Sequence, residues 1–179
     1  MVGGGEGAFI GAVHRIAARM DGAFRLVAGA LSSDAGRAEA SARALGLERS
    51  YAHFRQMAQA EAARPDGIRA VSIVTPNHLH APVAVAFLDA GIHVICDKPL
   101  AATPEQARTI AQAAANSRAR FFLTHNYCAH PMVREARAIV AEGKGELHIA
   151  QMAGLEGDAP NLTGVRLKSK ETGEYTHEC

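Results

Sequence analysis

The sequence has 179 residues, of which 48% are hydrophobic, and a formal net charge of +1. This length suits one ordinary domain, or one domain and part of another, with enough apolar side chains for a core. The near-neutral charge without a block of Lys and Arg excludes a nucleic-acid surface, and no apolar run approaches the ~20 residues that span a bilayer. We therefore expect small-molecule partners and, since no secretory leader pattern opens the chain, a cytoplasmic location.

The first part of the chain predicts a strand, a turn, a helix and a second strand. Residues 1–2 end a strand, a glycine cluster follows, and the Ala-rich residues 10–20 have helical periodicity. Residues 24–31 form a short apolar run typical of a buried parallel strand, and Ser33 and Asp34 can cap a helix over 35–45. Two residues are few for a first strand, which predicts either a missing N-terminal stretch or a short strand.

Helices and strands alternate through the rest of the chain up to Gly145. We expect helices over 51–63, 80–90 and 131–142, a further helix opened by Thr103 and Pro104, and strands over 70–74, 93–96 and 119–124. Such alternation predicts an α/β fold, a doubly wound parallel sheet of the Rossmann type. After one more strand over 147–153, the polar residues 154–179 predict an irregular tail or at most the stub of a second α/β domain.

The glycine cluster predicts a phosphate-binding loop. Gly3, Gly5 and Ala8 fit the spacing G-x-G-x-x-G/A. Closely spaced glycines let backbone N–H groups approach a pyrophosphate, and the following helix N-terminus adds a partial positive charge. A glycine cluster by itself is equally typical of an ordinary turn. Its place between the first strand and the first helix favours a dinucleotide-binding loop.

The end of the second strand leaves the choice between NAD and NADP open. The acidic residue that usually binds the adenosine ribose is absent, and Leu31-Ser32-Ser33 stands there instead. Ser32, Ser33 and Arg37 suit a 2′-phosphate, and therefore NADP. Ser33 and Asp34 are equally well explained as the cap of the next helix.

Three further loops follow strands and are expected at the same edge of the sheet, where ligands of open α/β sheets bind. Lys98 is the candidate catalytic group, because an ammonium can stabilise the alkoxide that develops when a secondary alcohol loses a hydride. Asp97 either orients Lys98 or caps its loop. Lys98 in isolation is more typical of a surface lysine, and the other loops favour the catalytic role. The candidate cofactor-binding residues in these loops are Thr75, Pro76, Asn77, His80, Lys98, Pro99 and Asn126.

In combination these residues resemble the Gfo/Idh/MocA oxidoreductases, and the resemblance covers residues 1 to about 145. The family's T-P-N-x-x-H segment, which borders the cofactor, matches Thr75 to His80. Its Glu-Lys-Pro motif, whose lysine lies beside the nicotinamide and the reacting carbon, matches Asp97-Lys98-Pro99 with Asp in place of Glu. Asn126 matches a position near the nicotinamide and the substrate pocket.

The resemblance implies an NAD- or NADP-dependent enzyme that transfers a hydride to or from a secondary alcohol or carbonyl of a sugar, cyclitol or related polyol. It implies a dinucleotide-binding domain over 1–128, and over 129–179 a linking helix with the start or remnant of a substrate and oligomerisation domain. A homo-oligomer is expected if that second domain is present. The family's Asp-x-x-x-His pair, which belongs to the second domain, is not found over residues 129–179, so no catalytic base is assigned.

Two other classes of protein remain as alternatives. One is a non-catalytic dinucleotide-binding module or an inactive truncated fragment, and the other is a nucleoside-phosphate-dependent transferase on a similar sheet. We expect no metal, because His177 and Cys179 lack a second ligand pair. The cysteines Cys96, Cys128 and Cys179 are odd in number and widely spaced, which predicts reduced thiols that are not nucleophiles.

Overall fold

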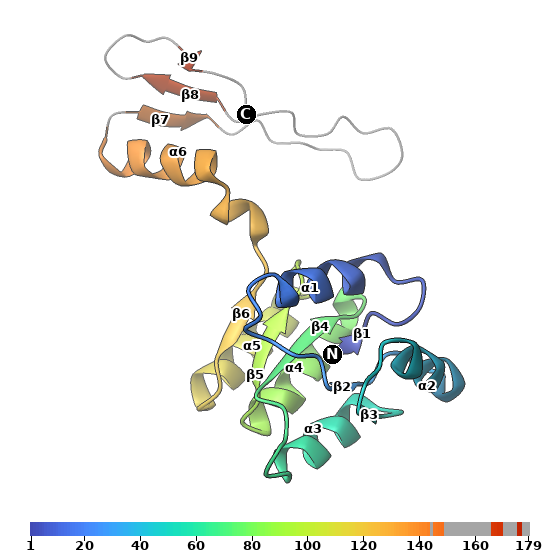
Figure 1. The fold of residues 1–179 in the computed structure, drawn as a ribbon. Coiled ribbons are helices and arrows are strands. Elements are labelled where there is room, and N and C mark those ends of the chain that lie inside the picture. Colours follow the sequence, from blue (N-terminus) through green and yellow to red (C-terminus); the bar gives the residue numbers. More distant parts are fainter. Residues whose placement is uncertain (144, 149–165, 170–174, 177–179) are drawn as a thin grey trace. The chain divides into compact units, whose positions relative to one another are not determined.

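The computed structural model describes residues 1–143, 145–148, 166–169 and 175–176. The chain divides into two compact units, Met1–Thr124 and His125–Cys179, each of which is described by itself (Figure 1). Within the part of the chain that the structure describes, every helix is too short or too polar to cross a membrane.

The first unit is built on parallel strands. Four of them pair in the order β1-β4-β5-β6, with the bounds β1 (Val2–Gly3), β4 (Ala70–Val74), β5 (His93–Cys96) and β6 (Phe121–Leu123). The pair β2 (Ala28–Gly29) and β3 (Arg49–Ser50) joins them edge to edge, because Val2 bridges Ala30 and the Gly3 N–H donates to the Ala30 carbonyl at 2.9 Å. The strands therefore follow the order β3-β2-β1-β4-β5-β6, and the predicted doubly wound α/β fold is confirmed.

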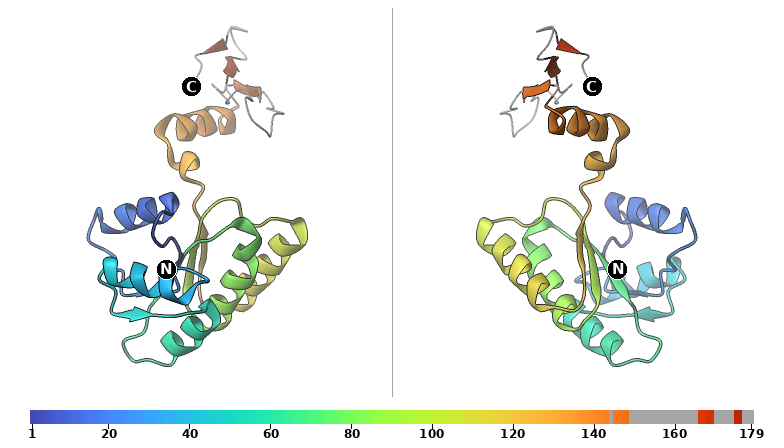
Figure 2. Two further views of the ribbon diagram at one scale, coloured as in Figure 1. Left: turned by 90° about the vertical axis from the view of Figure 1, so that its right-hand side faces the viewer. Right: turned by 90° about the vertical axis from the view of Figure 1, so that its left-hand side faces the viewer.

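Helices cover both faces of this sheet (Figure 2). Helices α1 (Phe9–Arg19) and α2 (Ala35–Ala44) lie on one face, and α4 (His80–Asp89) and α5 (Pro104–Asn116) lie on the other. Helix α3 (Phe54–Ala62) packs beside α4. This division follows from right-handed crossovers that run outward in opposite directions from β1 and β4.

The core lies between the sheet and the α4–α5 layer. Val71 and Ile73 of β4 and Val94 of β5 are fully buried, and they pack against Phe87 of α4 and Ile110 of α5. Helix α4 is apolar along most of its length because it lies in the middle of its layer. Although the first strand has only two residues, it contributes to this core through Val2.

Two strands and one helix face differ from the expectation. The apolar run 24–31 contributes only the two residues of β2, because Phe24 is 54% exposed and stays outside the core. The polar strand β3 was not expected, and α3 begins at Phe54 rather than at residue 51. In α1 the buried residue is Gly11, whereas the apolar side chains of Ile16 and Met20 are 64% and 82% exposed.

The second unit begins with the short 3-10 helix η2 (Asn126–Ala129) and α6 (Pro131–Ala141), as the expected helix over 131–142 required. The strands β7 (Gly145–His148), β8 (Arg166–Ser169) and β9 (Tyr175–Thr176) form an antiparallel sheet. The strand expected over 147–153 thus starts earlier, and its residues 149–153 lie outside the described residues. Strands β8 and β9 correct the interpretation of an entirely irregular tail, while residues 177–179 lie outside the described part.

Candidate functional site

The expected site loops of the first unit meet at one edge of the sheet. Gly3 pairs with Val74, and Ile73 and Leu123 both pair with Cys96, so β1, β4, β5 and β6 end at nearly the same level. The glycine loop and the loops that follow β4, β5 and β6 therefore emerge together. Between β1 and β4 the chain direction of the crossovers reverses, and such switch points are where open α/β sheets bind ligands.

The glycine loop has no room for side chains at the sheet. Gly3, Gly4 and Gly7 have φ angles of +75°, +74° and +78°, a region that L side chains rarely adopt. A Cβ built on Gly3 would lie 2.9 Å from the Val74 carbonyl oxygen, and one on Gly5 would lie 2.9 Å from the Leu31 carbonyl oxygen. The backbone itself thus lines this part of the loop.

Helix α1 packs directly on this loop through a residue that the sequence interpretation missed. A Cβ on Gly11 would stand 2.5 Å from the Gly4 Cα, so only glycine allows this approach. Arg15, one turn further, donates from Nη1 to the Gly4 carbonyl at 2.7 Å. A glycine inside a helical pattern is the signal that points to such a close contact.

Three features of this region fit a pyrophosphate-bearing dinucleotide. Ala8 begins α1 and provides no side-chain cap, so the positive end of the helix is left for an anion. Gly3, Gly4, Gly5 and Gly7 have no side chains, which allows close approach of the loop backbone. The Thr75 Oγ1 atom is buried and has no hydrogen-bond partner among the described residues, and the Cγ2 atom of the same side chain would lie 3.1 Å from a Cβ on Gly3. A buried polar atom of this kind is typical of a position completed by a ligand or a water molecule.

Of the polar side chains that follow β2, that of Asp34 caps the next helix, α2. Asp34 caps α2, because its Oδ1 accepts from the Arg37 N–H at 2.7 Å, and the Ser32 hydroxyl accepts from the Asp34 N–H at 3.1 Å. The side chains of Ser33 and Arg37 are exposed. The helix cap thus explains Asp34, while Ser33 and Arg37 remain available to a nucleotide, and the choice between NAD and NADP stays open.

The side chains that contact the Asp97 carboxylate are those of Thr124 and His14, not that of its neighbour Lys98. Its Oδ1 accepts from the Thr124 hydroxyl at 2.8 Å and lies 3.4 Å from Nε2 of His14. Burial alone would raise the pKa of Asp97, but hydrogen bonds from Thr124, His14 and the backbone N–H of Lys98 outweigh burial and lower it below its ordinary value. Asp97 is therefore an ionised carboxylate at neutral pH, and the side chain of Lys98 is exposed.

His80 joins two of the loops. Its side chain is 1% exposed, with Nε2 3.0 Å from the Thr75 carbonyl oxygen and Nδ1 2.8 Å from the Pro99 carbonyl oxygen. A carbonyl oxygen only accepts and a neutral imidazole carries one N–H, so the ring donates to one of these two carbonyls, and its tautomer decides which. Both ring nitrogens of His80 thus lie against backbone carbonyls of the protein. Its direct contact with a cofactor stays a prediction.

The other expected residues are placed as follows. Pro76 is exposed, and the exposed Asn77 begins the 3-10 helix η1 (Asn77–Leu79) directly after the Thr75 loop. Asn126 begins η2 in the second unit, so its place near a cofactor stays a prediction. Cys96 is buried, and burial together with the charge of Asp97 raises the pKa of its thiol to about 12. Cys96 is thus a thiol at neutral pH, which excludes a thiolate nucleophile there.

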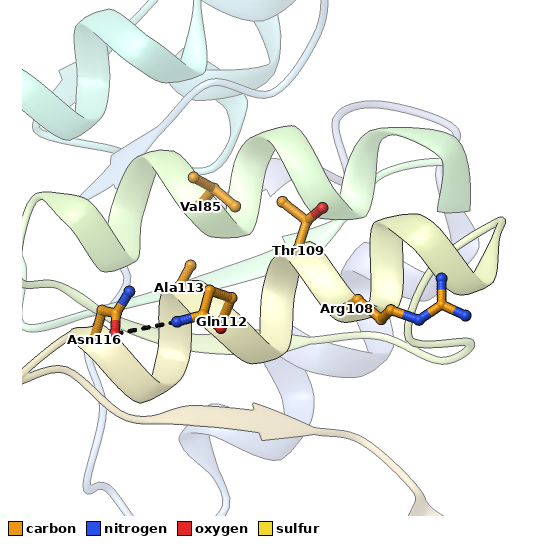
Figure 3. A pocket seen from close by; sticks show the side chains of 6 residues that line it. All are labelled: Val85, Arg108, Thr109, Gln112, Ala113 and Asn116. Atoms are coloured by element: carbon orange, nitrogen blue, oxygen red, sulfur yellow. Dashed lines mark hydrogen bonds between the residues drawn. The ribbon is translucent and has the colours of Figure 1, made fainter.

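A pocket of about 490 Å³ lies elsewhere, between α4 and α5 (Figure 3). Its lining consists of Val85, Arg108, Thr109, Gln112, Ala113 and Asn116. Gln112 and Asn116 hydrogen-bond to each other, and Arg108 pairs with Glu105 at 3.0 Å. None of the residues expected to bind a cofactor lines this pocket. We therefore place the site at the sheet edge.

Sheet order, glycine loop and the uncapped start of α1 define a dinucleotide-binding Rossmann domain. Residues 1–125 match the family described as "Oxidoreductase family, NAD-binding Rossmann fold", GFO_IDH_MocA. The chain belongs to the Gfo/Idh/MocA oxidoreductases and carries their NAD-binding domain, as the sequence motifs predicted.

Solved structures and a curated relative agree with this assignment. An oxidoreductase from Sinorhizobium meliloti is 55% identical with a TM-score of 0.77, over 82% of this chain and 42% of that one. An inositol dehydrogenase homolog complexed with NAD+ from Azotobacter vinelandii is 43% identical with a TM-score of 0.76, over 83% and 39%. Levoglucosan dehydrogenase of Pseudarthrobacter phenanthrenivorans is 35% identical over 150 residues, 80% of this chain and 36% of that protein. The chain spans less than half the length of these relatives.

Proposed function

We propose that the chain binds NAD or NADP at the glycine loop and serves as the nucleotide-binding part of an oxidoreductase. The substrate class is a sugar, cyclitol or related polyol, because the similar proteins include an inositol dehydrogenase homolog and a levoglucosan dehydrogenase. The observation that carries the proposal is the glycine-rich loop at the uncapped N-terminus of α1, next to Thr75, whose Oγ1 has no partner among the described residues. When bound, the nicotinamide supplies the hydride donor or acceptor.

The loop residues have distinct roles in this proposal. Gly5 provides its backbone N–H to the pyrophosphate, and Thr75 offers its hydroxyl to the nucleotide. Gly3 and Ala8 shape the loop, because their N–H groups donate to the carbonyls of Ala30 and Gly5. Pro76 and Asn77 border the cofactor beyond Thr75. His80 positions the loops of Thr75 and Pro99 through the contacts of its two ring nitrogens.

At the other end of the cofactor, Ser32, Ser33 and Arg37 border the adenosine ribose. Asn126 contacts the nicotinamide or the substrate from the second unit.

Lys98 is the proposed catalytic residue. Its exposed ammonium follows β5 at the ligand-binding edge, where it can donate a hydrogen bond to a substrate oxygen. As the carbon loses its hydride, the oxygen gains negative charge, and a positioned ammonium stabilises that charge. Asp97, held in the protein by Thr124 and His14, supports the loop rather than the reacting atoms.

A second candidate is a dinucleotide-binding module without turnover. It rests on the same glycine loop and requires no residue to accept a hydroxyl proton. The division into residues 1–128 and 129–179, a cytoplasmic location and a homo-oligomer remain predictions under either function.

Two glycine variants test the proposed cofactor site. Gly7 and Gly91 have φ angles of +78° and +74°, and a Cβ on either would meet no atom within 4 Å. Alanine at either position should thus destabilise the fold by the same ~1 kcal/mol, because of backbone strain. Only Gly7 lies in the loop, so Gly7→Ala should weaken NADH binding at least about tenfold, equivalent to ~1.4 kcal/mol, while Gly91→Ala should leave it unchanged.

The measurement is a titration with NADH and with NADPH, followed by nicotinamide fluorescence, beside urea unfolding of both variants. Equal stability with selective loss of binding in Gly7→Ala supports the site. Equal affinity of the two variants, or no saturable binding of either nucleotide to the wild-type chain, would overturn the assignment of the glycine loop.

A further inference from the structure

Lys98 is exposed, yet both residues that flank it are held by the protein. On one side, the Asp97 carboxylate is bound by Thr124 and His14, and its N–H donates to the Ile73 carbonyl at 2.9 Å. On the other side, the Pro99 carbonyl is bound by the buried ring of His80. The backbone that carries Lys98 is therefore fixed from two directions, whereas its side chain is left to reach outward.

His14 belongs to a different element from the other groups around Asp97. It lies on α1, with Nε2 3.4 Å from Asp97 Oδ1 and Nδ1 2.9 Å from the Ser72 hydroxyl of β4. Its side chain is 11% exposed and that of Asp97 is 15% exposed, so both are shielded from water. A charge-assisted hydrogen bond in such surroundings is stronger than the same contact at the surface.

This contact couples the glycine loop to the lysine loop. Helix α1 meets the glycine loop at Gly11 and Arg15, and it meets the Lys98 loop at His14. One rigid helix thus contacts the two loops that are proposed to bind opposite parts of the same cofactor.

We propose that His14 is a positioning residue for Lys98 and acts through the carboxylate of Asp97. The proposal rests on the proposed function, in which Lys98 lies beside the nicotinamide. The structural effect that it predicts needs no bound ligand: loss of His14 makes the backbone of Lys98 more mobile.

The first test is the NMR order parameter of the Lys98 amide, measured without nucleotide in the wild type, in His14→Ala and in His14→Gln. We expect a value near that of rigid backbone, about 0.85, in the wild type and below about 0.6 in His14→Ala. His14→Gln should restore order, because its amide can donate to Asp97 and accept from Ser72. The amides of Val94 and Ile95 in β5 should not change in either variant.

His53→Ala is the matched control. His53 caps α3, where its Nδ1 accepts from the Arg55 N–H at 3.2 Å, so its loss also lowers stability but leaves Asp97 untouched. An unchanged Lys98 order parameter in His53→Ala separates the proposed effect from general destabilisation. Should His14→Ala fail to fold, His14→Leu keeps the bulk of the side chain, removes the same contact with Asp97 and is expected to give the same local loss of order.

The second test is NADH affinity in a double-mutant cycle of His14→Ala and Asp97→Asn. If His14 acts through Asp97, each change should weaken binding by roughly threefold or more, and the double variant should be little weaker than either single one. Unchanged Lys98 order in His14→Ala, failure of His14→Gln to restore it, or fully additive losses would overturn the role of His14. A wild-type chain that binds no NADH would contradict the proposed function instead, while the order parameters still decide on His14.

Discussion

The carboxylate of Asp97 is partly buried, yet it stays ionised because three donors surround it. The hydrogen bonds from Thr124, His14 and the Lys98 N–H hold its pKa below the ordinary value of 3.8 although burial acts in the opposite direction. A carboxyl group with a lowered pKa in the folded state stabilises the fold above its unfolded-state pKa. This contribution disappears as the pH falls through the folded-state pKa.

Asp97→Asn should therefore lower the free energy of unfolding at pH 7, and the difference from the wild type should shrink as the pH falls below about 4. Urea unfolding at a series of pH values from 7 to 3 measures the difference. Glu105→Gln is the control, because Glu105 is exposed on α5 and its pairing with Arg108 is worth little in water. A difference between Asp97→Asn and the wild type that stays constant down to pH 3 would contradict the ionised network.

The sequence placed Lys98 and Thr75 at the ligand-binding edge because both follow buried strands. It did not predict His14 or the orphan Thr75 hydroxyl, since each depends on contacts between segments about 60 or more residues apart, such as His14 with Ser72 and Gly3 with Thr75. Asp97 illustrates the same limit. Its position next to Lys98 suggested a role in orienting that side chain, and only the fold shows Thr124 and His14 as its partners.

At the scale of elements, the contact between α1 and the glycine loop is the closest approach that shapes the site. Gly11→Ala would place a Cβ 2.5 Å from the Gly4 Cα, so we expect a loss of about 1–3 kcal/mol from overpacking and weaker NADH binding. Gly36→Ala is the matched control in α2, because its nearest neighbour, Asp34 Oδ1, would be 3.4 Å away.

Gly36→Ala should be neutral or stabilising by up to about 1 kcal/mol, since alanine favours the helix. Urea unfolding of both variants gives the comparison. Similar stability of the two variants would mean that α1 does not pack on the glycine loop as described.

Helices were predicted more closely than the strands β2 and β3. Thr103 and Pro104 open α5 as expected, because caps and proline act within a single turn. Strands β2 and β3 each have two residues and exist because they pair with each other, which no local pattern encodes. The apolar periodicity of residues 10–20 predicts helix α1 correctly. It does not predict that Ile16 and Met20 are exposed.

At the scale of the whole chain, strand order places the glycine loop at the switch point of the sheet. Sequence reasoning reached the doubly wound parallel sheet, because alternating helices and strands with right-handed crossovers leave few topologies, whereas the order of the strands comes from the structure. The antiparallel strands β8 and β9 were not predicted, because the segment around them is polar and lacks periodicity.

The central claim is that a nicotinamide dinucleotide binds at the sheet edge and not in the pocket between α4 and α5. The most direct measurement is a set of amide ¹H–¹⁵N spectra of the chain during titration with NADH. We predict saturable shifts at Gly3, Gly5, Thr75 and Lys98, with Gln112 of the α4–α5 pocket unchanged. Shifts centred on Gln112 and its neighbours, with an unaffected glycine loop, would contradict this account.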